Sequence, residues 1–304
     1  MIIAGTIERT HTMKKIFALG FFDGVHLGHQ ALLVECCRMA REQNAKACAI
    51  TFRQHPQSLF VEQPPKLINE QEGRIQLMRR YGIGPVFVYP VTKEVMSMSW
   101  QDFLNELLEC DAIGFVCGCD FRFGNRGEGS AEKLKAYCAE RNLLCSIVED
   151  QHLDGIRVSS THIRNLLEAG NLEEAIRFMG HPHVLTGTVV SGRKLGRTIG
   201  VPTANLPLPE DVVQLPRGVY ACKAIVDQQE YLAVTNIGSR PTVGGHRVTV
   251  EPWILDFDGD LYGQALTLLF YAFLRPERKF ESLEELKEEI QKNARQVRKI
   301  FEKT

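Results

Sequence analysis

The chain has 304 residues, enough for two medium-sized domains that each bury a core. Hydrophobic residues make up 44% and charged residues 24% of it, which is ordinary for a globular protein and excludes disordered and fibrous classes. The 36 basic and 37 acidic residues leave a net charge of −1, so we expect neither nucleic acid nor a membrane surface as a principal partner.

Up to about residue 180, short apolar runs alternate with segments of helical periodicity. The apolar runs, which predict strands, cover residues 14–19, 46–52, 85–91, 112–118 and 143–149. The periodic segments, which predict helices, cover residues 31–43, 70–81, 99–109 and 130–141. This alternation predicts an α/β domain over residues 1–182, with a parallel sheet covered by helices on both faces. Ligands of such sheets bind beyond the carboxyl ends of the strands.

The pattern changes near residue 182. Strand-length runs follow, separated by Gly, Pro and Asp, at residues 187–192, 217–238, 247–259 and 264–274. They predict an antiparallel β-barrel or sandwich over residues 183–304. A helix with one apolar stripe closes the chain, and Ser282 followed by Glu285 predicts a capping box at its start.

The cysteines and the first residues of the chain indicate where in the cell the protein is expected. The nine cysteines form no C-x-x-C pair, so we expect buried reduced thiols, with a ligand pair at Cys117 and Cys119 as the alternative. No apolar run approaches the roughly 18 residues that span a bilayer. The first residues lack the apolar region of a signal peptide. We therefore expect a cytoplasmic protein.

The stretch GFFDGVHLGH, residues 20–29, joins the first long strand to the first helix. Glycines let the backbone approach a ligand, and a helix N-terminus attracts phosphates. His26 and His29 lie one helical turn apart and so face the same ligand. A zinc site needs further ligands, and no suitable pair in the sequence completes it. We interpret the stretch as a phosphate site; a tight turn with two solvated or buried histidines is the alternative.

Two further polar clusters belong to the same predicted domain. In residues 117–129 a strand runs into a glycine-rich loop whose polar side chains are Asp120, Arg122, Asn125 and Arg126. In VSSTHIR, residues 158–164, three hydroxyls lead into a helix that carries Arg164, although such hydroxyls equally fit helix caps. With the histidines, these groups supply the positioning and charge neutralisation that transfer of a nucleotidyl group needs.

The second predicted domain contains SGRKLGRTIGVPTANL, residues 191–206. It is not a Walker A loop, because no Gly-Lys-Ser/Thr follows at the right spacing. A glycine-rich basic loop followed by a hydroxyl and an amide can hold a magnesium-bound nucleotide, whereas an ordinary basic hairpin is the alternative. Glu251 lies on an alternating strand, where a solvated carboxylate is the simpler interpretation. The aspartates in residues 256–260 lack the complete EF-hand spacing and predict a turn.

These motifs, in this order, resemble the bifunctional prokaryotic riboflavin kinase/FMN adenylyltransferase family, also called FAD synthetase. GFFDGVHLGH, CDFRFG and VSSTHIR are similar to its adenylyltransferase half; GRTIGVPTANL, RGVY, TNIGSRPT and VEPWILDFDGDLYG are similar to its kinase half. The resemblance covers nearly the whole chain. It implies an N-terminal Rossmann-like nucleotidyltransferase domain that adenylates FMN to FAD with release of pyrophosphate. It also implies a C-terminal barrel that phosphorylates riboflavin.

For the adenylyltransferase half, the resemblance implies that His26 and His29 stabilise charge during catalysis. It places ATP and its phosphates at Gly20, Phe22, Asp23, Gly24, Asn125, Ser159, Ser160, Thr161 and Arg164. It places the flavin, more weakly, at Phe52, His55, Pro56, Asp120 and Phe121.

For the kinase half, the resemblance implies that Glu251 is the base toward the ribityl hydroxyl of riboflavin. It places ATP at Gly192, Lys194, Gly196, Arg197, Gly200, Pro202, Thr203 and Asn205. Mg²⁺ would be held by Thr203 and Asn205, with ATP as co-substrate and riboflavin, FMN and FAD as the other ligands. A homo-oligomer is compatible with the sequence, which does not fix the number of copies.

Two rival interpretations stay open at this point. One is a single-activity adenylyltransferase with an accessory barrel, which the sequence Pro-Thr-Ala-Asn together with Glu251 disfavours. The other is a flavin-binding regulator that has lost catalysis, which the complete set of His, Thr, Asn and Glu residues disfavours.

Overall fold

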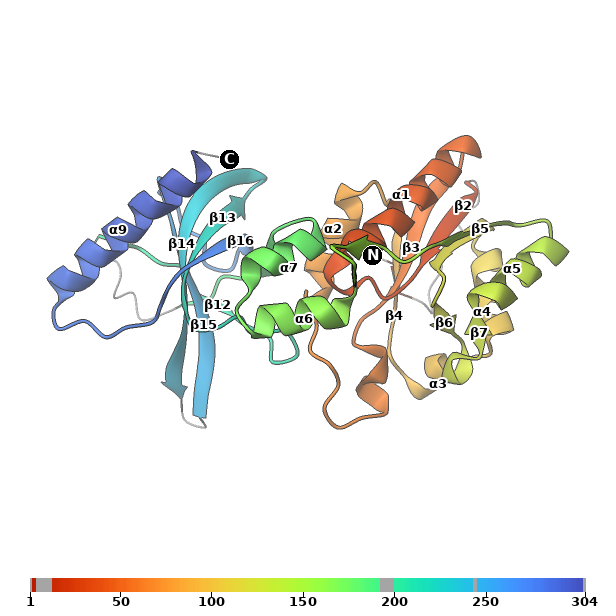
Figure 1. The fold of residues 1–304 in the computed structure, drawn as a ribbon, viewed down its shortest axis with the longest axis horizontal. Coiled ribbons are helices and arrows are strands. Elements are labelled where there is room, and N and C mark those ends of the chain that lie inside the picture. Colours follow the sequence, from red (N-terminus) through yellow and green to blue (C-terminus); the bar gives the residue numbers. More distant parts are fainter. Residues whose placement is uncertain (1, 4–12, 192–199, 243–244, 303–304) are drawn as a thin grey trace. The chain divides into compact units, whose positions relative to one another are not determined.

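The structure, a computed structural model, describes residues 2–3, 13–191, 200–242 and 245–302 (Figure 1). It divides into two compact units: Met1–Leu67 with Arg74–Ser160, and Ile68–Gly73 with Thr161–Thr304. This division reflects packing. The functional boundary between residues 182 and 183 stays a prediction.

The first unit is built on a parallel sheet of six strands in the order β1-β4-β3-β2-β5-β8. The strands are β1 (Ile2–Ile3), β2 (Lys15–Leu19), β3 (Lys46–Phe52), β4 (Val86–Tyr89), β5 (Ala112–Gly118) and β8 (Leu144–Val148). The predicted parallel sheet is confirmed. Its edge strand β1 had no prediction, because two residues are too few to show a period.

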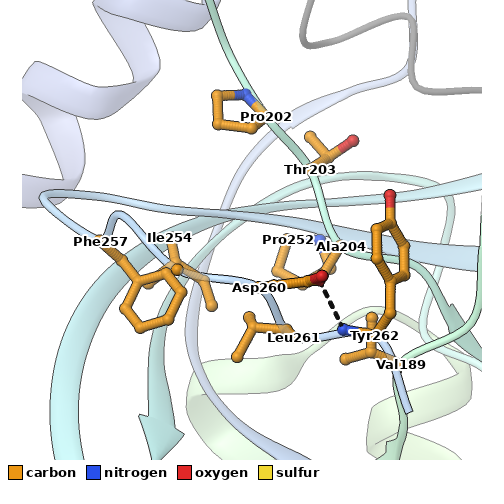
Figure 2. Close-up of a pocket in the computed structure, with 11 residues that line it drawn as sticks. Val189, Pro202, Thr203, Ala204, Pro252, Ile254, Phe257, Asp260, Leu261 and Tyr262 are labelled. Carbon is orange, nitrogen blue, oxygen red and sulfur yellow. Dashed lines mark hydrogen bonds between the residues drawn. The ribbon is translucent and has the colours of Figure 1, made fainter. Parts of the chain in front are cut away.

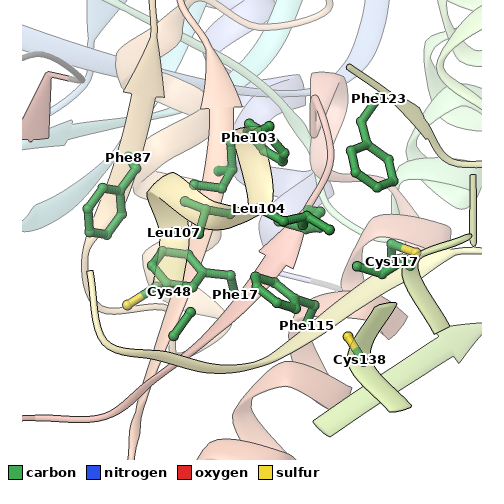
Figure 3. Close-up of a cluster of buried hydrophobic side chains, with 14 of the residues drawn as sticks. Phe17, Cys48, Phe87, Phe103, Leu104, Leu107, Phe115, Cys117, Phe123 and Cys138 are labelled. Carbon is green, nitrogen blue, oxygen red and sulfur yellow. The ribbon is translucent and has the colours of Figure 1, made fainter. Parts of the chain in front are cut away.

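Helices cover both faces of this sheet, as predicted. The helices that contact its strands are α1 (Leu27–Glu42), α4 (Trp100–Glu109) and α5 (Ala131–Glu140). The unit also contains α3 (Lys93–Met96) and most of α2 (Gln71–Arg80). On one face, the Cys36 thiol of α1 donates to the backbone carbonyl of Ile16 at 3.3 Å. Because neighbouring residues of a strand point to opposite faces, Phe17 faces the other side. There it joins a buried cluster that includes Phe115 and side chains of α4 and α5 (Figure 3).

Short elements lie between these helices and strands. Two small antiparallel pairs are β6 (Arg122–Phe123) with β7 (Gly129–Ser130), and β9 (His152–Leu153) with β10 (Ile156–Arg157). Three 3-10 helices are η1 (Asp23–Val25), η2 (Pro56–Leu59) and η3 (Asn125–Gly127). Two of them, η1 and η3, interrupt the glycine-rich stretches that the sequence marked as binding loops.

The second unit contains an antiparallel sheet of six strands in the order β11-β16-β13-β14-β15-β12. The strands are β11 (His183–Thr188), β12 (Leu206–Pro207), β13 (Gly218–Val226), β14 (Gln229–Thr242), β15 (Gly245–Ile254) and β16 (Ala265–Pro276). The edge strands β11 and β12 contact each other. Beside them, the Val190 N–H donates to the Asn205 carbonyl at 2.9 Å. The sheet is therefore nearly closed, which confirms the predicted barrel.

Helices flank the barrel: α6 (Ser160–Glu168), α7 (Leu172–Met179) and α9 (Leu283–Phe301). The last one packs on β13 and β14 (Figure 1) and buries Ala294 and Val297 against them. The Ser282 hydroxyl accepts a hydrogen bond from the Glu285 N–H at 3.1 Å, which is one half of the predicted capping box. The Glu285 carboxylate accepts from the Glu281 N–H, also at 3.1 Å, and not from the Ser282 N–H that the box requires. Among the described residues, no helix is both long and apolar enough to cross a membrane.

All nine cysteines lie within the described residues and are free thiols. In the same part of the chain, no group of three or more His, Cys, Asp or Glu side chains is arranged to hold a metal ion. The alternative of a metal at Cys117 and Cys119 therefore finds no further ligand there.

His183 on β11 is buried against the barrel. Its side chain is 3% exposed, and its ring centroid lies 5.9 Å from that of Phe270. Within the described residues, its Nδ1 atom has no hydrogen-bond partner. Burial, with a smaller contribution from His181, lowers the pKa of His183 from 6.5 to about 4. His183 is therefore neutral at pH 7.

This burial predicts an acid-dependent loss of stability. The unfolded chain protonates His183 near pH 6.5 and the folded chain only near pH 4. The free energy of unfolding should thus fall as pH drops through this window, by about 3 kcal/mol from this residue. His183→Leu should flatten that dependence. Urea unfolding, followed by Trp253 fluorescence in a Trp100→Phe background, measures it.

The control is His152→Leu, since His152 is exposed on β9. It should leave the pH dependence of the parent protein unchanged. Equal pH dependences for the His183→Leu variant and the parent would contradict the prediction.

Candidate active sites

The turn after β2 lies where the strand order of the first sheet reverses. β2 is flanked by β3 on one side and β5 on the other. A crevice therefore opens beyond its carboxyl end, the usual ligand position in such sheets. The turn is tight, because Phe22 and Gly24 have positive φ angles of 58° and 80°. Backbone strain of this kind at a non-glycine residue concentrates at functional sites.

His26 and His29 stack on each other where α1 begins. His26 caps the helix, since its Nδ1 atom accepts a hydrogen bond from the His29 N–H at 3.3 Å. The ring centroids are 3.6 Å apart with planes at 16°, and Phe22 meets the His29 ring edge-on at 5.3 Å. Gly28 leaves room for the stack, because a Cβ atom there would lie 3.2 Å from Cε1 of His26. The helix begins at Leu27, earlier than predicted, so His29 lies in its first turn and His26 is its N-cap residue.

His29 is neutral in the free protein. Burial lowers its pKa well below the usual value, and the charges of His26 and Arg74 lower it further. Its Nδ1 atom is buried and has no hydrogen-bond partner within the described residues. A buried polar atom without a partner calls for an explanation.

The VSSTHIR motif contacts the glycine turn through Ser160. The Ser160 hydroxyl donates to the backbone carbonyl of Asp23 at 2.8 Å. Asp23 itself is 1% exposed, and Ser159 lies half-buried beside Ser160. Two motifs that are distant in the sequence therefore meet at one turn, as their predicted common ligand requires.

The rest of that motif belongs to the second unit. Thr161 is exposed, whereas Arg164 is buried on α6. Their predicted contacts with the phosphates of ATP stay predictions.

An aromatic cavity of about 150 Å³ adjoins the glycine turn, and Gly20 is part of its wall. Three of the five predicted flavin residues, Phe52, Pro56 and Phe121, also line it. The Phe121 and Phe123 rings stack at 5.4 Å with planes at 15°. A concave, mostly apolar surface with stacked aromatic rings suits a flat heterocycle.

The two other predicted flavin residues lie outside the cavity wall. His55 packs edge-on against the Phe21 ring at 5.3 Å. Asp120 is exposed and forms an ion pair with Arg157, which also binds Asp150 at 2.8 Å. Any contact of either residue with a flavin stays a prediction.

Asn125 lies in η3, the loop after β6. Its side chain is exposed, and its N–H donates to the Met98 carbonyl at 2.7 Å. The preceding Gly124 has φ 74° and ψ −176°, a conformation that is essentially restricted to glycine. A Cβ atom there would also lie 2.6 Å from the backbone nitrogen of Trp100. Gly124 is thus required where this loop crosses the start of α4, beside the aromatic cavity.

In the second unit, most of the predicted basic loop lies outside the described residues: Gly192, Lys194, Gly196 and Arg197. The described end of the loop reaches Gly200, whose φ is 74°. Pro202 and Thr203 then line a small cavity of about 60 Å³, together with residues 257 and 259–262. Figure 2 shows Asp260 there, where its carboxylate accepts a hydrogen bond from the Tyr262 N–H at 3.1 Å. This bond fits the predicted turn.

A larger cavity of about 400 Å³ shares Thr203 with the small one, so the two adjoin. Its polar wall includes Glu251, Asn236 and Arg275, and its apolar wall includes Trp253. A few converging polar groups on an apolar surface are typical of a small-molecule site.

Glu251 faces this larger cavity. β15 places it directly opposite Asn236 of β14. Its carboxylate accepts a hydrogen bond from the Thr249 hydroxyl at 3.0 Å. The carboxylate is half-buried at a cavity, so an open strand surface does not describe its position.

Asn205 is 7% exposed next to β12. Its Oδ1 atom is buried and has no hydrogen-bond partner within the described part of the chain. It is absent from the walls of both described cavities. The structure therefore supplies an unsatisfied oxygen in the Pro-Thr-Ala-Asn segment, close in sequence to Thr203.

Sequence reasoning missed Arg74, Asn236 and Arg275. Arg74 is fully buried, yet it lies in a polar helical segment that carries no sign of burial. Asn236 and Arg275 reach the larger cavity through strand register, which one sequence does not fix. The stretch TNIG around Asn236 belongs to a motif that resembles the kinase half, and this resemblance was the sequence signal that could have identified Asn236.

Comparisons with known proteins match both halves of the chain. A family model described as FAD synthetase matches residues 8–162, and one described as riboflavin kinase matches residues 179–301. A bifunctional riboflavin kinase/FMN adenylyltransferase from Listeria monocytogenes is 34% identical over 98% of this chain and 96% of its own. The chain belongs to the bifunctional riboflavin kinase/FMN adenylyltransferase family.

Other relatives agree with this family assignment. A bifunctional riboflavin kinase/FMN adenylyltransferase from Bacillus subtilis is 33% identical over 95% of this chain and 93% of its own. A solved structure from Streptococcus pneumoniae, named a macrolide-efflux protein, aligns with TM-score 0.81 and 29% identity over 95% of each chain. That name disagrees with both family models, and the assignment to the riboflavin kinase/FMN adenylyltransferase family rests on those models and the closely covering relatives.

Gly124 gives a test of the loop geometry. Gly124→Ala adds a Cβ atom that meets the Trp100 backbone and also strains a positive φ. We expect a loss of about 3 kcal/mol or more in the free energy of unfolding. Gly155→Ala is the matched control, because Gly155 has φ 79° with nothing within 4 Å of the added atom. It should cost about 1 kcal/mol. Urea unfolding followed by Trp100 fluorescence compares them, and equal costs would refute the steric argument.

Proposed function

We propose that the chain converts riboflavin to FMN at the barrel and FMN to FAD at the glycine turn, with ATP as co-substrate in both steps. The main support in the first unit is that Gly20 belongs both to the turn and to the wall of the aromatic cavity. A phosphate site and a flavin-sized aromatic surface therefore adjoin. The names of the relatives supply the substrates.

The adenylyl transfer needs positioning and charge stabilisation. The FMN phosphate attacks the α-phosphorus of ATP in line, the bond from that phosphorus to the β-phosphate oxygen breaks, and pyrophosphate leaves. The attacking phosphate is already ionised at neutral pH, so this step needs no general base. Fixed donors that face the developing charge carry most of such catalysis.

The residues proposed for this step surround the glycine turn. His26 and His29 donate hydrogen bonds to the phosphates, and a neutral His29 retains one N–H for this purpose. The turn itself and the flanking motifs bind ATP through Gly20, Phe22, Asp23, Gly24, Asn125, Ser159, Ser160, Thr161 and Arg164. The flavin ring lies in the aromatic cavity against Phe52, Pro56 and Phe121.

The phosphorylation of riboflavin needs a base, because its acceptor is an alcohol. Glu251 lines the larger cavity, and a carboxylate there accepts the ribityl hydroxyl proton as the oxygen attacks the γ-phosphorus. The bond from that phosphorus to the β-phosphate oxygen breaks, and ADP leaves. Because Thr203 lines both cavities, ligands in the two cavities would meet at this residue. We assign riboflavin to the larger cavity, which contains Glu251, and ATP to the small one. Gly200 and Pro202 flank the nucleotide there.

Mg²⁺ fits the donors of the Pro-Thr-Ala-Asn segment. Mg²⁺ prefers oxygen ligands and is usually held by one or two protein groups plus substrate phosphates. Asn205 offers a buried oxygen without a partner in the described residues, and Thr203 offers a hydroxyl. Bound there, the ion would neutralise phosphate charge during transfer.

The boundary and location follow as proposals. We place the functional boundary between residues 182 and 183, just after the Gly180 cap of α7 and before β11. Nine free cysteines suit the reducing cytoplasm. The net charge of −1 supports small-molecule rather than nucleic-acid or membrane partners.

A turnover assay with riboflavin and ATP tests the whole proposal. Chromatography that resolves FMN from FAD should show FMN first and FAD later, with pyrophosphate equal to FAD. FAD from supplied FMN, with none from riboflavin, would instead support the single-activity adenylyltransferase. Flavin binding without either product would support the inactive regulator.

His29→Ala should stop FAD formation while FMN still accumulates. Loss of one donor that stabilises developing charge is expected to lower the adenylyl transfer rate by about 10²–10³. The kinase rate should not change, because all residues assigned to it lie in the barrel. His152→Ala, an exposed histidine of the same unit, is the control. Loss of both products in a folded His29→Ala protein would contradict the assignment of two separate sites.

Glu251→Gln should have the opposite effect. The amide keeps the size of the side chain but cannot accept the proton, so FMN formation should fall by roughly 10²–10⁴. FAD formation from supplied FMN should persist, and ATP affinity should change little. Glu230→Gln is the control, because Glu230 lies on β14 and pairs with Lys223 away from the larger cavity. Near-normal kinase turnover in Glu251→Gln would rule out Glu251 as the base.

A further inference from the structure

Arg74 is a buried cation near the glycine turn. It lies on α2 and is 0% exposed, the largest of the fully buried side chains in the described residues. Removing a guanidinium from water costs several kcal/mol unless other groups compensate it. The hydrogen bonds of the Arg74 guanidinium must therefore compensate this cost, and their acceptors show which segments Arg74 connects.

The Arg74 guanidinium donates to the ends of two loops. Its Nη2 atom lies 2.9 Å from the Phe52 carbonyl oxygen and 3.4 Å from that of Arg53. Its Nη1 atom lies 3.5 Å from the Phe21 carbonyl oxygen, and its Cζ atom is 4.6 Å from the centre of the Phe21 ring. The Thr51 hydroxyl also donates to the Phe21 carbonyl, at 2.7 Å.

These loops form the two proposed halves of the adenylyl-transfer site. Phe21 lies in the glycine turn, directly after Gly20. Phe52 ends β3, and its side chain lines the aromatic cavity. One planar fork of donors therefore connects the proposed phosphate site to the proposed flavin site. A lysine ammonium has no such fork.

Arg74 also acts on His29 through its charge. Burial is the main cause of the low His29 pKa, followed by His26 and then Arg74. Other titratable or charged residues of this region include the buried Asp23 in the same turn, His55 against Phe21, and Arg53, whose carbonyl Arg74 contacts. The permanent positive charge of Arg74 thus adds to the effect of burial on the His29 pKa and attracts anionic ligands.

We propose that Arg74 is a positioning residue for adenylyl transfer, which fixes the glycine turn relative to the flavin cavity and supplies a constant positive field to the phosphates. This inference rests on the proposed function. It assigns no direct contact between Arg74 and substrate.

Two substitutions separate the charge from the geometry. Arg74→Met removes both and should lower the FAD formation rate by about 10²-fold, since small misplacements of reacting groups cost that much. The acid limb of its kcat/KM profile should move to higher pH, because the His29 pKa rises when the charge is lost. Arg74→Lys keeps the charge, so its acid limb should stay in place. Its KM for FMN should rise about tenfold, because the fork is lost.

Riboflavin phosphorylation by the same samples is the internal control and should not change. Arg79→Met is the matched control, since Arg79 is an exposed arginine on the same helix. If Arg74→Met lowers only the melting temperature and leaves the kinetics and pH profile unchanged, Arg74 is a structural residue and the inference is wrong.

The remaining outcomes are also decisive. If Arg74→Met does not fold, Arg74→Lys decides: kcat and KM for FMN both within about twofold of the parent would overturn the inference, whereas the tenfold rise supports it. A parent protein that makes no FAD would refute the proposed function instead. The two failures are therefore distinguishable.

Discussion

The first unit depends on how the carbonyl groups of its glycine turn are satisfied. Left-handed backbone at Phe22 and Gly24 turns the chain sharply after β2, and buried carbonyls need donors from elsewhere. Ser160 supplies one to Asp23 at 2.8 Å, and Thr51 and Arg74 supply two to Phe21 at 2.7 and 3.5 Å. Three separate segments are thus fixed to one turn. This explains why a hydroxyl motif far along the chain and a buried arginine accompany the glycine-rich stretch.

The two proposed sites differ because their acceptors differ. An ionised FMN phosphate needs no base, and the glycine turn accordingly presents imidazoles, hydroxyls and backbone rather than a free carboxylate assigned to proton removal. A ribityl hydroxyl must lose a proton as it attacks, and the larger cavity of the barrel contains Glu251. Each unit therefore carries groups of the kind that its proposed step requires. Glu251 is suited to the proposed role of base only because of its position, since a glutamate on the outer face of a strand would simply be solvated.

Periodicity and glycine spacing predicted much of the molecule. The strands over residues 46–52 and 112–118 match β3 and β5, since buried parallel strands are continuous apolar runs. The start of α1 at Leu27 escaped prediction, because His26 as a cap depends on a side-chain bond that the pattern does not show. Arg74 escaped for a tertiary reason: its neighbours in RIQLMRR suggest a solvated helix, whereas its actual partners are carbonyls on other loops. The roles of the site residues were inferred from motif resemblance. The residues that line the cavities could not be predicted, because they depend on strand register and side-chain packing.

Charge in the first site is divided between fixed and titratable groups. An arginine keeps its proton at any working pH, so Arg74 gives the turn a constant field, whereas His29 is a titratable group. Burial, with smaller contributions from His26 and Arg74, holds the pKa of His29 low, which preserves a neutral imidazole with one donor N–H at neutral pH. The triphosphate of the proposed ATP ligand would oppose that effect, because an anion next to an imidazole favours its protonated form. The burial that keeps His29 neutral in the free protein therefore makes its protonation state sensitive to the anion that binds beside it.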